Sequence, residues 1–164
     1  MAELTNLESK LGEVTGLAMA AKAATGTVTK LARPDHKELV DRLKSMAQEA
    51  AETERRCTEL AGTFNGKKTA ILDEARETKD KGASMLKIYL DEESDALDGF
   101  EFLTMAEAGE VGHWKVLEQM ANSAGRRDVI ELVRWALPIQ IGHFDTATST
   151  CVKLAREENP DEES

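Results

Sequence analysis

The sequence predicts an all-α protein that folds as a helical bundle. Apolar residues recur at intervals of three and four along most of the 164 residues, which is the period of one helix face. No segment alternates β-branched and polar residues as a half-buried strand does, and the chain contains three prolines. We therefore expect one domain over residues 1–155. The acidic tail at 156–164 lacks apolar content and is expected to be disordered.

Two long helices are expected at the start of the chain. The first should cover residues 4–32, with an apolar stripe free of carboxylates that consists of Leu4, Leu7, Leu11, Val14, Ala18, Ala21, Thr25 and Val28. Pro34 ends this helix, because proline lacks an amide hydrogen and disfavours helical geometry in the residue before it. Asp35 is then expected to cap a second helix that ends at Gly62.

The second half of the chain begins with a charged stretch. Residues 67–81 are expected to form a short accessory helix, and residues 82–90 an accessory segment whose conformation stays open. A long central helix should follow over residues 91–121, opened by acidic residues at the positive end of its dipole. The last helix is expected to be capped by Asp128. Pro138 should kink it, because proline removes one backbone hydrogen bond.

Two carboxylates interrupt the apolar face of the central helix. Glu107 and Glu110 fall on the face that carries Trp114, where a protein core normally places leucine. Burial of an ionised carboxylate costs several kcal/mol unless the group is paired or bound to a metal. Gly109 and Gly112 flank Glu110, which indicates either a close helix contact or space for a ligand.

The last helix carries a matching polar pair, Gln140 and His143, on its apolar face. Iron(II), manganese(II) and zinc accept imidazole nitrogen and carboxylate oxygen, so Glu107, Glu110 and His143 are expected to form a facial set around one ion. His113 projects about 100° from the centre of this face and would join only if the helix rotates. The alternative is a buried hydrogen-bonded network in which a carboxylate and Gln140 satisfy His143.

Charge and composition argue against several functions. A formal net charge of −10 disfavours a nucleic-acid partner, because phosphate binding relies on a basic surface. No segment approaches the ~18 continuous apolar residues of a membrane span and no signal peptide is recognised, so we expect a cytoplasmic protein without membrane contact. Cys57 and Cys151 lie on apolar stripes and are expected to be buried free thiols. The chain also lacks a glycine-rich phosphate loop and a nucleophile elbow.

The pattern Glu107-x-x-Glu110-x-x-His113, together with Gln140-x-x-His143, resembles the ferritin-like superfamily of di-iron carboxylate bundles. The layout over most of residues 4–155 is similar to a bacterial stress-associated branch of unassigned activity. This resemblance implies an antiparallel four-helix bundle with a short accessory helix between its two hairpins. In the family, each of two helices gives one Glu and each of the other two gives Glu-x-x-His, all facing inward.

Departures from this family pattern reduce the expected ligand set. Gln140 stands where the last helix would carry an acid, and the second helix offers Glu49 or Glu52 without a histidine. The metal ligands that the resemblance implies are Glu107, Glu110, His113 and His143. Gln140, Glu49 and Glu52 would be weaker ligands or hydrogen-bond partners of the ligands. The site would be mononuclear or a depleted dinuclear one that holds iron or manganese, with zinc less favoured, and a metal-free descendant also fits.

Two functions from different classes remain open. In the first, the protein is a ferritin-like metal-carboxylate oxidoreductase or an iron-handling protein linked to oxidative stress, which uses O₂ or peroxide as co-substrate only if metal is bound. In the second, it is a non-catalytic helical-bundle stress or interaction protein with a buried Glu/Gln/His network and no metal, and a homodimer through a long helix face. The sequence does not decide whether the protein is an enzyme.

Overall fold

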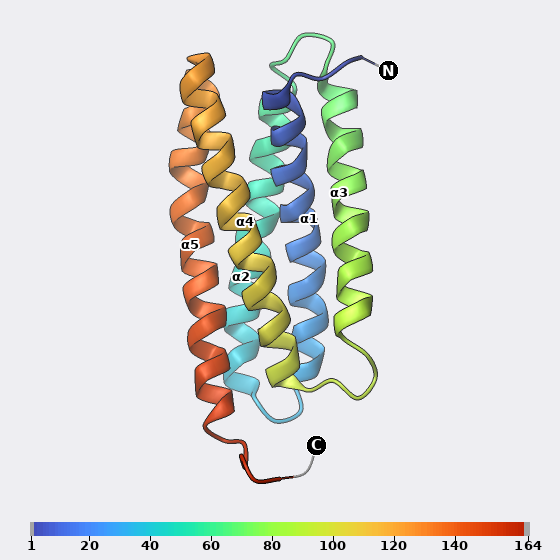
Figure 1. Cartoon of the computed structure of the whole chain (residues 1–164), viewed down its shortest axis with the longest axis vertical. Helices are drawn as coiled ribbons and strands as arrows, with labels where there is room; N and C mark the ends of the chain where they lie inside the picture. Colours follow the sequence, from blue (N-terminus) through green and yellow to red (C-terminus); the bar gives the residue numbers. More distant parts are fainter. Residues whose placement is uncertain (1, 163–164) are drawn as a thin grey trace.

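Five α-helices build the computed structural model, which describes residues 2–162 (Figure 1). They are α1 (Asn6–Ala32), α2 (Lys37–Ala61), α3 (Lys68–Tyr89), α4 (Ala96–Ala124) and α5 (Arg127–Ala155). The described residues contain no strand. The prediction of an all-α protein is therefore confirmed.

Four of these helices form a ring, in which α1 packs against α2 and α4, and α5 packs against α4 and α2. The remaining helix, α3, lies outside the ring against α1 and, to a lesser extent, α2. Figure 1 shows that consecutive helices run in opposite directions, so α2 and α4 run the same way. The chain thus returns along the length of the bundle through α3 before the second hairpin begins.

Two separate hydrophobic clusters fill the ring. One cluster includes Leu11, Trp114 and Val133 and lies toward the α4–α5 connection. The other includes Leu43 and Phe100 and lies toward the α3–α4 connection. Burial of each large side chain stabilises the fold by roughly 1.5–3 kcal/mol. Between the two clusters, the inward positions of α4 and α5 are occupied by polar side chains, and the candidate site lies in this layer.

Helix starts differ from the sequence expectations in three places. The N-cap residue of α2 is His36, so Asp35 lies in the preceding turn, too early to accept from the first helical amides. The central helix begins at Ala96, because Asp95 and Asp98 form a reciprocal capping box there. At the start of α5, Asp128 pairs with Arg126 instead of capping the helix.

The accessory element is longer than predicted, because α3 is one helix of 22 residues and not a short helix followed by a separate segment. Small residues explain its close packing on α1. A Cβ atom at Gly16 would clash with the backbone carbonyl of Ala75, and one at Gly82 would lie 2.7 Å from Cβ of Ala20. The position of α3 is therefore fixed mainly by its close contact with small residues of α1. A long apolar stripe on α3 contributes less.

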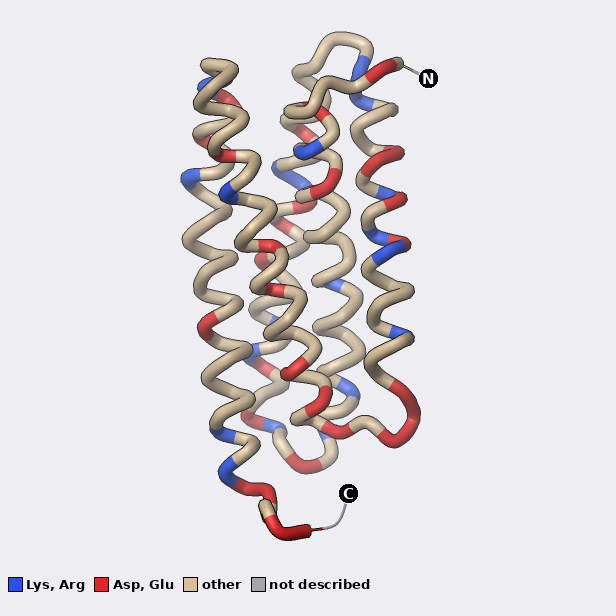
Figure 2. The backbone as a smooth tube through the Cα atoms, in the orientation of Figure 1, with Lys and Arg blue, Asp and Glu red and all other residues tan. Residues whose placement is uncertain are grey.

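The last helix continues through Pro138 to Ala155 without a break. Residues 156–162 then form exposed turns and bends, and residues 163–164 of the predicted tail lie outside the described part of the chain. Figure 2 shows acidic residues gathered in this tail and in the connection between α3 and α4. No helix within residues 2–162 has the length and apolar content needed to cross a membrane.

Candidate functional site

A polar layer crosses the middle of the bundle between the two hydrophobic clusters. Glu107 and Glu110 enter it from α4, and Gln140 and His143 enter it from α5. Glu107 is 1% exposed and Glu110 is 3% exposed, and the two α5 side chains are also buried. The burial predicted for these four residues from helix periodicity is therefore confirmed.

Three of these side chains interact directly with one another or with α2. The amide Nε2 of Gln140 donates a hydrogen bond to Oε2 of Glu107, and Nδ1 of His143 lies 3.8 Å from the same oxygen. The other ring nitrogen of His143, Nε2, lies 2.6 Å from Oε2 of Glu49. The side chain of Glu49 is 46% exposed, so the network extends from the interior to the surface of α2.

Glu110 takes no part in this network. Neither a hydrogen bond nor an ion pair connects its carboxyl group to any described residue, although the side chain is buried. Burial raises the pKa of Glu110 well above its usual value, and the nearby charge of Glu107 raises it further. Burial also raises the pKa of Glu107 to about 8, opposed by the hydrogen bond from Gln140. Near neutral pH the interior therefore favours the protonated acids.

His113 and Glu52, both expected near the site, lie outside it. The side chain of His113 is 41% exposed, and its Nδ1 lies 3.0 Å from Oε2 of Glu13 and 3.3 Å from Nζ of Lys10. This places His113 in a surface cluster between α4 and α1. Glu52 hydrogen-bonds to two arginines on the outer face of α2, which lower its pKa to about 2. Between the two acids of α2, Glu49 is the one that reaches the interior.

The donor atoms do not converge as a metal site requires. The two ring nitrogens of His143 face different carboxyl groups, and Oε2 of Glu107 already accepts from Gln140. Within residues 2–162, no three His, Cys, Asp or Glu side chains are grouped so that they could hold an ion. The arrangement therefore does not fit iron or manganese, for which several oxygen and nitrogen donors must meet at one point. A ligand role for Glu107, Glu110, His113 or His143 stays a prediction.

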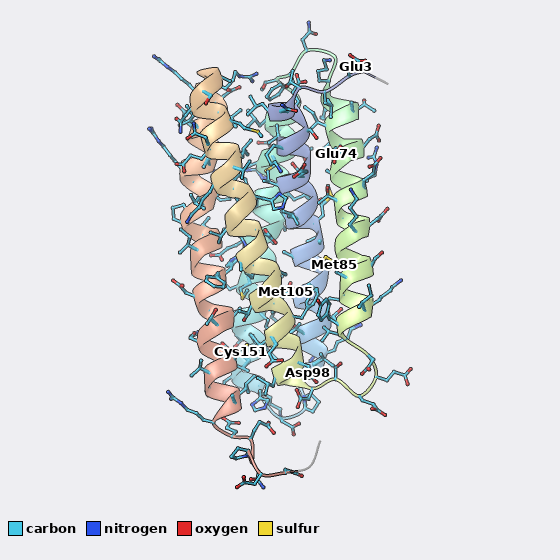
Figure 3. The ribbon with its side chains drawn as sticks, viewed as in Figure 1. Glu3, Glu74, Met85, Asp98, Met105 and Cys151 are labelled. Atoms are coloured by element: carbon cyan, nitrogen blue, oxygen red, sulfur yellow. The ribbon has the colours of Figure 1, made fainter. Side chains whose placement is uncertain are left out.

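A groove of about 290 Å³ opens beside the polar layer, between α1, α3 and α4. Glu107 and Glu110 line it together with small or apolar side chains, among them Met85 of α3 and Met105 of α4, which are labelled in Figure 3. A Cβ atom at Gly109, which also lines the groove, would meet no atom within 4 Å. Of the two explanations offered for this glycine, close helix contact is therefore wrong, and space for a ligand stays a prediction.

Sequence reasoning missed this groove, although two signals for it are present. The first is the run of small residues on α1, including Ala20 and Ala24. Their short side chains form the floor of the groove, and larger side chains of α3 and α4 form its walls. The second is the glycine spacing on α1, where Gly12 and Gly16 admit the backbone of α3. Together these signals predict that α3 packs closely on α1 at Gly12 and Gly16. They also predict that the small residues of α1 beside α4 stay uncovered.

The thiols and the buried indole offer little further chemistry. Both cysteines are free, and Cys57 is fully buried, which raises its thiol pKa to about 12. Cys151 is half-buried, with Sγ 3.4 Å from Oγ1 of Thr104. The prediction of a buried free thiol is thus confirmed for Cys57, whereas Cys151 is only partly buried. In the described part of the chain, Nε1 of Trp114 is the one enclosed side-chain nitrogen or oxygen without a hydrogen bond.

Comparisons with known proteins add no constraint, since no family model, curated protein or solved structure matches the chain. What the arrangement can do is set by its own chemistry. Protonated carboxyl groups in a buried layer can donate and accept hydrogen bonds, and they ionise readily when a cation approaches. A groove that leads to such groups is suited to recognition of a small molecule.

Proposed function

We propose that the protein is a non-catalytic, ligand-binding bundle of ferritin-like architecture, in which the interior carboxyl groups recognise a small molecule and hold no redox metal. The observation that carries this proposal is the groove of about 290 Å³ whose lining includes the buried acids Glu107 and Glu110. Ligand sites are typically concave and largely apolar, with a few polar groups that fix orientation, and this groove has that composition.

Two features support a ferritin-like architecture without its metal chemistry. A ring of two antiparallel hairpins joined by one connection as long as the bundle is the connectivity of ferritin-like folds, and α3 supplies that connection here. Gln140 stands in place of an acid and donates its amide hydrogen to Glu107. An amide that donates to a carboxylate satisfies that group without an ion, whereas an acid at the same position would repel it.

Iron or manganese handling is the competing function, and one observation favours it. Glu107 and Glu110 are both buried and neither is paired with a lysine or arginine in the described residues, so a bound cation would relieve the repulsion between their ionised forms. An ion would have to displace Gln140 from Glu107 and turn His143 away from Glu49. This rearrangement makes metal binding the weaker of the two proposals.

The deciding experiment is metal analysis of untagged protein purified without chelator, before and after anaerobic loading with Fe(II) or Mn(II). Inductively coupled plasma mass spectrometry is applied to the natural chain, to Glu107→Ala and His143→Ala, and to Glu101→Ala as an exposed control on α4. The proposal predicts only trace metal in all four proteins. Near-stoichiometric metal that is lost in the two interior variants and retained in the control would overturn it and establish the competing function.

A further inference from the structure

We infer that the groove between α1, α3 and α4 binds an alkylammonium ligand, a protonated primary amine whose charged end pairs with Glu110 and whose apolar body lies along the groove. This inference rests on the proposed ligand-binding function and names the class of ligand. Four observations carry it: an unpartnered buried acid, a one-sided distribution of polarity, the size of the space and the charge of its surroundings.

The unpartnered acid is Glu110, which is 3% exposed and has no hydrogen-bond partner among residues 2–162. The only side-chain nitrogen or oxygen in that range that is both enclosed and unbonded is Nε1 of Trp114. The carboxyl oxygens of Glu110 therefore keep contact with accessible space, and Glu110 lines the groove. A cation at this position would pair with the ionised form of Glu110, for which the described residues supply no other partner.

Polarity is distributed unevenly along the groove. Helix register places Glu110 and the partly exposed His113 toward one end, because they lie two or more turns of α4 beyond Phe102 and Leu103. The other end is formed by apolar side chains from all three helices, including Leu86 of α3. A ligand with one charged end and an apolar body matches this division, whereas a compact ion or a sugar does not.

The volume of the groove and the charge of its lining residues restrict the class of ligand further. At roughly 30 Å³ for each atom of water size, a space of about 290 Å³ holds about ten non-hydrogen atoms, so octylammonium is a suitable probe. A cation is favoured over a fatty acid because Glu107 and Glu110 can ionise to pair with a cation, and the net charge of −10 also attracts cations. Lys79 is the one basic residue among the lining residues besides His113, and its side chain is exposed.

The first experiment compares octylammonium, octanol and octanoate by isothermal titration calorimetry on chelator-treated protein. We expect octylammonium to bind, octanol to bind at least tenfold more weakly because it lacks the charge, and octanoate to give no detectable heat. Octanoate binding as tightly as octylammonium would overturn the ligand class while supporting a ligand-binding function. Binding of none of the three overturns the inference, and metal analysis of protein purified without chelator decides the proposed function separately.

Two matched glycine variants test the location. Gly109→Leu places a side chain in the groove, and Gly112→Leu places the same side chain one turn further along α4, outside the groove, where a Cβ atom also meets nothing within 4 Å. Both should increase helix stability similarly, since each replaces a helical glycine. We expect Gly109→Leu to weaken octylammonium binding at least tenfold and Gly112→Leu to leave it unchanged. Equal effects of the two variants would place the ligand elsewhere.

Glu110→Gln tests the charged contact while keeping the side-chain shape. We expect it to weaken octylammonium binding at least tenfold and to leave octanol binding unchanged, which a loss of folding would not do. Unchanged octylammonium binding in this variant would overturn the role of Glu110. Circular dichroism of the variant establishes that the bundle is intact, and the glycine pair supplies a test that does not depend on this residue.

Discussion

Nε2 of His143 on α5 lies 2.6 Å from Oε2 of Glu49 on α2, although 94 positions separate the two residues in the sequence. The ring N–H donates to a carboxyl group that accepts at the edge of the interior. Because Nδ1 of the same ring faces Glu107 at 3.8 Å, His143 stands between a surface acid and a buried acid. This contact joins the two hairpins of the bundle through polar side chains.

Loss of the Glu49 carboxyl group should therefore destabilise the protein more than loss of Glu52, an acid one turn away that has no contact with the interior. We expect Glu49→Ala to lower the free energy of unfolding by ~1–2 kcal/mol, because the buried ring of His143 loses its acceptor. Glu52→Ala, which removes only surface pairs with arginines, should lower the free energy of unfolding by less than Glu49→Ala does. Urea unfolding measures both. In a His143→Ala background the additional effect of Glu49→Ala should vanish, and an undiminished effect would show that the contact contributes nothing.

The buried acid Glu107 should make the protein less stable as pH rises. Its pKa is raised from 4.5 to about 8 in the folded chain, so the folded state holds a proton between these values that the unfolded state has lost. The associated stability is fully present below pH 4.5 and disappears as pH rises through 8. The effect is on the order of 4 kcal/mol, measurable as a falling urea midpoint from pH 5 to pH 9.

Glu107→Gln isolates this contribution, since an amide resembles the protonated acid and has no charge to develop. The variant should reduce the pH dependence to the part that the buried acid Glu110 contributes, and it should be more stable than the natural chain at pH 9. Glu101→Gln, an exposed substitution on the same helix, is the control and should keep the original slope. If the slope is undiminished in Glu107→Gln, the pH dependence originates in another group, and Glu110 is then the first to test.

Helix periodicity was sufficient to place Glu107, Glu110, Gln140 and His143 in the interior. Each occupies a position three or four residues from apolar neighbours on a long helix, and burial of such a face is a local property of sequence. The same local signals predicted five helical segments in the correct order. They erred at helix starts, where a shift of one residue decides which side chain can cap.

Contacts between residues of different helices could not be predicted from helix periodicity. Helix periodicity places Glu49, and not Glu52, near the edge of the apolar face of α2, but the contact of Glu49 with His143 depends on how α2 is rotated against α5. The register of α3 likewise depends on glycines of α1 that carry no hydrophobic signal. The groove follows from that register, because it is the part of the α1 surface between α3 and α4 that neither helix covers.

The two cysteines should differ in reactivity in the folded protein. Cys57 is enclosed and its pKa is raised to about 12 by burial, so almost no reactive thiolate forms at pH 8. Cys151 is half-buried, and burial raises its pKa as well, although solvent still reaches the side chain. Iodoacetamide with peptide mass spectrometry should modify Cys151 slowly and Cys57 only after unfolding in guanidinium. Early modification of Cys57 would contradict the packing of α2 in the core.

Close packing of α3 on α1 should make two glycines of α1 respond in opposite ways to the same substitution. At Gly16 an added Cβ atom would clash with the carbonyl oxygen of Ala75, which is backbone and cannot turn aside. Gly16→Ala should therefore cost ~2–3 kcal/mol and expose α3 to limited proteolysis.

Gly26 lies in the same helix but faces open space, where a Cβ atom meets nothing within 4 Å. Gly26→Ala should stabilise the protein by ~0.5–1 kcal/mol, because alanine loses less backbone entropy in a helix than glycine. Guanidinium unfolding of the two variants compares them directly, with helix propensity cancelled between them. A stabilising Gly16→Ala would mean that α3 does not approach α1 at this point, and the groove beside it would then have no fixed wall on that side.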